Sequence, residues 1–66
     1  MTGEDIYLKN IIDAMRAIRL GKKTPKESNI GRNLNKLKEV NIGLYEDYLE
    51  QYKKVLADYV VNTFLN

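Results

Sequence analysis

The 66-residue chain contains no cysteine, no histidine and no tryptophan, and it has one proline and one phenylalanine. The missing cysteine and histidine exclude disulfide bonds, thiolate nucleophiles, histidine bases and the usual ligands of zinc. Long hydrophobic runs are missing as well, because stretches such as Val60–Val61 and Phe64–Leu65 fall far short of the roughly 20 residues that span a bilayer. The first residues, Met1–Asp5, are acidic where a signal peptide would be basic. The sequence therefore predicts neither a membrane segment nor a targeting segment, and we expect a cytoplasmic protein.

The composition that remains is typical of a folded domain. Hydrophobic residues make up 44% of the chain and charged residues 30%, a balance that favours a globular module over a disordered chain. Residues 1–66 have room for a single small domain. A chain of this length buries only about 60% of the surface that it exposes when unfolded, so we expect marginal stability unless it self-associates. It has no room for a substrate pocket beside its core.

Apolar residues recur at helical spacing in three segments of the chain. The first predicted helix covers residues 3–20. Thr2 can cap its start, and Gly21 suits the left-handed position that follows the end of a helix. The apolar face of this segment consists of Tyr7, Leu8, Ile11, Ile12, Met15 and Ile18.

The second predicted helix covers residues 25–40 and has the strongest start signal of the three. Thr24 and Glu27 form a capping-box pattern around the only proline, which a helix tolerates best at its first position. The segment Asn41–Gly43 interrupts the pattern, and the third predicted helix covers residues 44–64. No segment shows the alternation of a β-strand. The predicted fold class is therefore all-α, a small three-helix bundle with a long C-terminal helix.

Charge is unevenly distributed, although the formal net charge is only +2. Residues 16–38 carry eight basic residues and one acid, for +7, whereas residues 1–15 sum to −2 and residues 39–66 to −3. One interpretation is nucleic-acid binding, in which exposed helical Arg and Asn side chains read base edges and the preceding lysines hold phosphates. Its candidate residues are Lys22, Lys23, Lys26, Asn29, Arg32, Asn35 and Lys36. The alternative is a solvated basic segment that offsets the acidic flanks.

The third segment carries two features that predict contact with a partner. All four of its tyrosines share one face, which indicates either a partner-binding stripe or packing against the other helices. After Val60 the segment is apolar on more than one side, which favours contact with a second copy or with a groove in another protein. The alternative is a frayed terminus folded over the core. The candidate protein-interaction residues are Tyr48, Val61, Phe64 and Leu65.

The sequence gives no support for catalysis. Ser28 is the only serine and has no histidine to activate it, while Glu46 and Glu50 share a helix face on which no further acid converges. The glycines match no phosphate-binding loop. We therefore predict no catalytic residue, no cofactor, no metal site and no small-molecule substrate.

The sequence predicts a small helical accessory or regulatory protein that works through protein–protein interaction, either as a homodimer or with another protein. The competing hypothesis is a nucleic-acid-binding transcriptional regulator, and a structural subunit of a larger particle is a third class. The frequent use of Lys, Asn, Ile and Tyr is typical of AT-rich genomes and of microbial or phage proteins.

Overall fold

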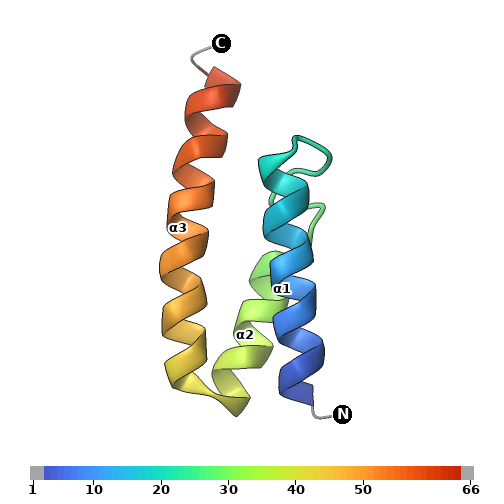
Figure 1. The fold of residues 1–66 in the computed structure, drawn as a ribbon, viewed down its shortest axis with the longest axis vertical. Coiled ribbons are helices and arrows are strands. Elements are labelled where there is room, and N and C mark those ends of the chain that lie inside the picture. The colour runs from blue at the N-terminus through green and yellow to red at the C-terminus, as the bar shows by residue number, and fades with distance from the viewer. Residues whose placement is uncertain (1–2, 65–66) are drawn as a thin grey trace.

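The computed structural model describes residues 3–64, which form three α-helices and no strand. They are α1 (Gly3–Arg19), α2 (Ile30–Val40) and α3 (Ile42–Phe64). The chain runs along α1, returns along the shorter α2 and reverses again into α3, and each helix packs against both others (Figure 1). The predicted all-α three-helix bundle is confirmed.

The core consists of eight buried apolar side chains, of which α1 supplies four, α2 three and α3 only one, Val55. α3 joins the core mainly through half-buried tyrosines and leucines that surround the buried residues. Burial raises the pKa of the Tyr52 hydroxyl above its usual value, in line with this packing. The tyrosine stripe of α3 therefore packs against the other helices. The buried residues are Ile11, Ala14, Met15, Ile18, Ile30, Leu34, Leu37 and Val55.

α1 ends in a Schellman motif at Gly21. This glycine adopts a φ of +73°, its N–H donates to the Ile18 carbonyl at 3.1 Å, and the Lys22 N–H donates to the Ala17 carbonyl at 2.9 Å. The two bonds satisfy carbonyls of the last helical turn, and glycine adopts the left-handed φ at the lowest cost. The predicted role of Gly21 is confirmed, although the helix itself ends one residue earlier than predicted, at Arg19.

The predicted start of the second helix is wrong by five residues, because α2 begins at Ile30. The predicted capping box does form: the Thr24 N–H donates to Oε1 of Glu27, and the Glu27 N–H donates to Oγ1 of Thr24, each at 3.2 Å. The turn that it starts stops at Asn29, whose φ of 58° and ψ of 24° are left-handed. Residues 25–29 therefore form a separate turn, and Asn29 precedes α2 instead of lying on its exposed face.

A single residue, Asn41, separates α2 from α3, where the sequence predicted a break of three residues. Its backbone N–H donates to the Leu37 carbonyl at 2.7 Å and closes α2. Its side-chain Oδ1 accepts a hydrogen bond from the Leu44 N–H at 3.1 Å and caps α3. Because Asn41 closes α2 through its backbone and caps α3 through its side chain, α3 begins at Ile42 and not at the predicted Leu44.

The capping box gives Glu27 a pH-dependent role. The hydrogen bond with the Thr24 backbone, then that with the Thr24 side chain, and the charge of Lys23 lower the pKa of this carboxyl. A lowered folded-state pKa means that the contribution of Glu27 to stability is present above its unfolded pKa and is lost as the pH falls through the folded pKa. In an NMR titration we expect the Glu27 carboxyl and the Thr24 amide to share a midpoint below the usual range for glutamate. Glu27→Gln is expected to make the acid dependence of stability shallower, and a midpoint at or above the usual value would contradict the cap.

Candidate interaction surfaces

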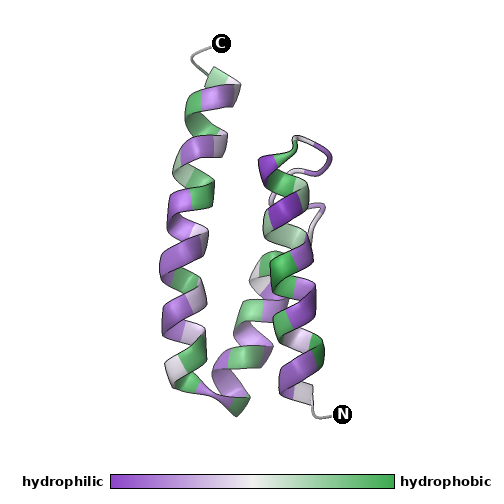
Figure 2. Ribbon diagram, in the orientation of Figure 1, coloured by the Kyte–Doolittle hydropathy of each residue, from purple (hydrophilic) through white to green (hydrophobic). Residues whose placement is uncertain are grey.

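The C-terminal half of α3 presents an apolar surface to solvent. Val60, Val61 and Phe64 are 44%, 50% and 76% exposed. Leu56 and Ala57 lie about one turn earlier on the same side of the helix. Figure 2 shows hydrophobic segments of α3 continuing to the upper end of the helix. We call Leu56, Ala57, Val60, Val61 and Phe64 the α3 outer patch.

The arrangement of the other helices leaves the α3 outer patch uncovered. α1 stops below the end of α3, and α2 occupies only the lower part of the bundle, so the last turns of α3 rise above both (Figure 1). The connection between α1 and α2 reaches the inner side of these turns, where Tyr59, Asn62 and Thr63 line a pocket of about 300 Å³ together with Lys22 and Lys23. The outer side has no such neighbour among the described residues.

The structure does not bring the predicted protein-interaction residues together on one surface. Val61 and Phe64 belong to the α3 outer patch, whereas Tyr48 is half-buried against the core on the side of α3 that faces α1. Tyr48 and Phe64 are also 16 residues apart on one helix, a separation of about 24 Å. Leu65 lies outside the described residues. Two of the four predicted residues thus lie together, and Tyr48 belongs to another surface.

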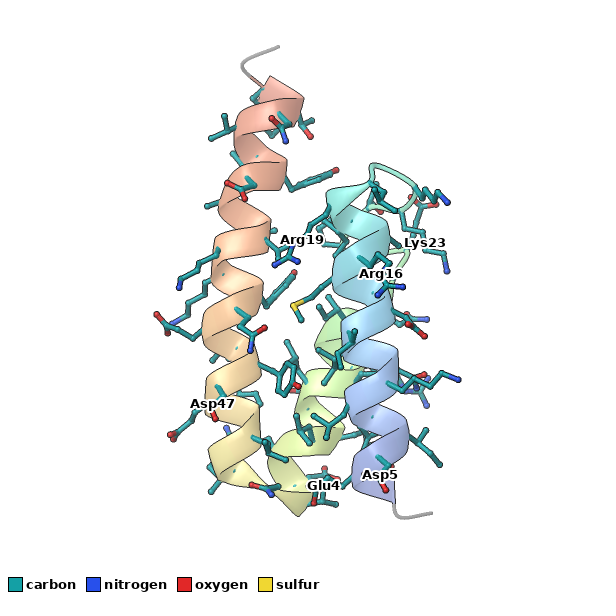
Figure 3. The ribbon with its side chains drawn as sticks, in the orientation of Figure 1. Glu4, Asp5, Arg16, Arg19, Lys23 and Asp47 are labelled. Carbon is teal, nitrogen blue, oxygen red and sulfur yellow. The ribbon has the colours of Figure 1, made fainter. Side chains whose placement is uncertain are left out.

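Tyr48 lines a groove between α1 and α3 with a volume of about 360 Å³. Figure 3 shows Arg19 extending from α1 towards α3, with Arg16 one turn lower on α1. The sequence analysis missed this groove, because it arises only when α1 and α3 pair. The sequence feature that could have indicated the groove was Leu20, an apolar residue outside the main apolar face of the first predicted helix. We call this surface the α1–α3 groove, and it is lined by Ile12, Met15, Arg16, Arg19, Leu20, Tyr48 and Gln51.

The candidate nucleic-acid residues are all exposed, but they fall into two groups. Arg32, Asn35 and Lys36 lie on the outer side of α2, opposite its buried residues, and Glu39 lies beside them. The other group lies in the connection between α1 and α2 and consists of Lys22, Lys23, Lys26 and Asn29. The basic segment is therefore divided between α2 and the connection that precedes it, and its binding to nucleic acid stays a prediction.

Six labelled charged side chains divide by sign along the long axis of the molecule (Figure 3). Figure 3 shows Arg16, Arg19 and Lys23 towards the end where α1 stops, and Glu4, Asp5 and Asp47 towards the opposite end. Asp47 is therefore not interleaved with the upper basic residues. Glu27 lies beside Lys23 at the upper end, so this separation of charge is partial.

The only serine has a structural role in the turn before α2. The Ser28 hydroxyl donates to the Pro25 carbonyl at 2.7 Å and accepts a hydrogen bond from the Ile30 N–H at 3.3 Å. Both bonds hold the backbone between the capping box and α2. The hydroxyl is therefore engaged by the turn on its donor side and on its acceptor side.

Neither a metal cluster nor a membrane-spanning helix occurs in residues 3–64. No three acidic side chains in this range lie close enough together to hold a metal ion. Over the same residues, every helix lacks the length or the hydropathy that crossing a bilayer requires.

The chain matches no protein-family model, no curated protein and no solved structure.

Proposed function

We propose that the protein self-associates through the α3 outer patch and acts as a small accessory or regulatory protein in the cytoplasm. The exposure of the patch carries the proposal. Val60, Val61 and Phe64 leave 44%, 50% and 76% of their surfaces in water. Fully burying an apolar side chain of this kind contributes about 1.5–3 kcal/mol relative to leaving it exposed, and burial of this kind would offset the cost of association.

The small core of one chain supports the same proposal. α3 comprises 23 residues, yet Val55 is its only fully buried side chain. A chain of this size rarely gains more than roughly 3–5 kcal/mol from a single core, and association is one of the common ways to add to it. A second copy on the outer side of α3 would supply burial that the bundle itself does not provide.

The charges on the outer side of α3 favour an antiparallel pairing. Glu50 and Lys53 lie on that side, on the N-terminal side of the patch. Parallel helices in register would set each charge opposite its own copy, and like charges repel. Antiparallel helices centred near Val60 avoid this and place Leu56 of one copy against Phe64 of the other. Such a contact is isologous, as in most homodimers, and brings the negative end of each helix towards Lys53 of the other copy.

Val61→Asp is expected to convert a dimer into a monomer, because it places a charge in the centre of a dry contact. Sedimentation equilibrium over a range of protein concentrations measures the change. Val40→Asp is the matched control, since Val40 is 53% exposed and also lies near the end of a helix but outside the patch. We expect this control to keep the wild-type association.

Two results would contradict the self-association proposal. One is a well-folded wild-type chain that stays monomeric at every concentration. The other is a dimer that Val40→Asp dissociates as readily as Val61→Asp, since the contact would then lie elsewhere. Circular dichroism on each variant separates loss of association from loss of the fold.

A further inference from the structure

We propose that the α1–α3 groove binds an acidic amphipathic helix of another protein. The groove lies on the side of α3 that carries Tyr48, whereas the α3 outer patch lies on the opposite side of that helix and nearer its end. The groove is therefore a second interaction surface, and its occupation does not depend on self-association.

The apolar part of the groove has the dimensions of a helix contact. Ile12 is 41% exposed and Leu20 is 62% exposed, while Met15 and Tyr48 supply a more buried base between them. Leu20 lies in the turn directly after α1, eight residues beyond Ile12, a separation of about 12 Å at the helical rise. That length corresponds to about two turns of a partner helix, which would present apolar side chains at i, i+3 or i+4, and i+7.

The charged side chains of the groove favour a partner with negative charge. Arg16 and Arg19 line the groove, and no acidic side chain lines it with them. Guanidinium groups bind carboxylates through paired, charge-assisted hydrogen bonds, and these are stronger next to an apolar surface than in open water. The labelled acids Glu4, Asp5 and Asp47 lie towards the other end of the molecule (Figure 3). A helix with acidic flanks is therefore the complementary partner.

The mixed lining of the groove favours a protein helix over nucleic acid. Phosphate groups would pair with Arg16 and Arg19 but would leave Ile12 and Leu20 in water. A helix with an apolar stripe and acidic flanks covers the apolar side chains and pairs the arginines in one contact. Arginine is also enriched in protein interfaces, whereas most other charged residues are depleted from their centres.

The test is a titration with a defined peptide probe. The probe is a fluorescein-labelled helical peptide of about 18 residues with leucine at i, i+4 and i+7 and glutamate on both flanks. Its binding is followed by fluorescence anisotropy, and ¹⁵N chemical shifts locate the contact. A second peptide with lysine in place of every glutamate controls for hydrophobic attraction, and duplex DNA is titrated in parallel.

We expect the acidic peptide to bind and to shift the amides around Ile12, Arg16 and Leu20. Affinity should fall with added salt, and Arg16→Glu combined with Arg19→Glu should weaken it by about tenfold or more. The matched double variant is Arg32→Glu with Lys36→Glu, which makes the same charge change on the outer side of α2 and should leave peptide affinity within about twofold.

Three outcomes would overturn the proposal. The first is an acidic peptide that shifts no groove amide, and the second is equal binding of the acidic and lysine peptides. The third is binding of duplex DNA, and not of the peptide, that the Arg16/Arg19 variant abolishes. Sedimentation of that variant also checks self-association, which should be unchanged, so the groove and the α3 outer patch succeed or fail independently.

Discussion

Leu37→Ala is expected to leave the chain largely unfolded at room temperature. Leu37 has none of its surface exposed and belongs to α2, which packs against both other helices. Replacing a fully buried leucine with alanine costs about 2–5 kcal/mol, because transfer free energy is lost and a cavity is left. A core of this size supplies roughly 3–5 kcal/mol in total, so the substitution removes most of the stability. Circular dichroism with thermal and urea unfolding measures the loss.

Val40→Ala is the control for the core substitution. Val40 lies one turn further along α2 and is 53% exposed, so its truncation leaves no cavity and should change stability by less than about 1 kcal/mol. Both variants must be compared at one low protein concentration, because self-association would add to the apparent stability of either. A cooperative Leu37→Ala transition close to that of the wild type would show that the eight buried residues do not form the core that stabilises the fold.

The fold class could be predicted because each helix has an apolar stripe strong enough to identify it in isolation. The apolar residues of α1 and α3 follow the helical period over many turns. Gly21 marks the end of α1, because this position requires a positive φ and glycine adopts a positive φ most easily. These signals are local. They depend on a few neighbouring residues and need no knowledge of where the other helices lie.

The start of α2 could not be predicted, because two local signals compete there. Thr24 and Glu27 form a true capping box, and its hydrogen bonds are the same whether the turn continues or stops. What stops the turn is the left-handed conformation of Asn29, which asparagine tolerates but does not require. The new start at Ile30 allows Ile30, Leu34 and Leu37 to be buried together, and this choice is made by packing.

The two candidate interaction surfaces differ in the same respect, because one could be predicted from local signals and the other could not. The exposed end of α3 could be predicted, because Val61 and Phe64 lie on more of the helix surface than two neighbouring helices can cover. The α1–α3 groove could not, since Arg19 and Tyr48 are far apart in the sequence and meet only in the folded chain. Tyr48 was predicted as an interaction residue, but its neighbours on α1 could not be named from the periodicity of one helix.

Asn29→Val is expected to destabilise the protein by about 1–2 kcal/mol. A φ of 58° brings Cβ close to the following carbonyl, and a β-branched side chain makes that conformation worse. The Asn29 side chain makes no capping hydrogen bond to α2, and its carbonyl, which accepts from the Asn33 backbone at 3.2 Å, is kept in every variant. The loss is therefore conformational. Asn29→Gly relieves the same strain and should be neutral or slightly stabilising.

Asn35 provides the comparison for this pair of substitutions, because it is an exposed asparagine within α2. In an ordinary helical turn glycine costs more than valine, so the order of the two variants should be reversed relative to position 29. Urea unfolding of the four variants measures which of glycine and valine is more stable at each of the two positions. If the glycine variant is less stable than the valine variant at position 29 as well, the backbone at this residue has a right-handed conformation. The capping box at Thr24 would then begin one continuous helix that runs from residue 25 to Val40.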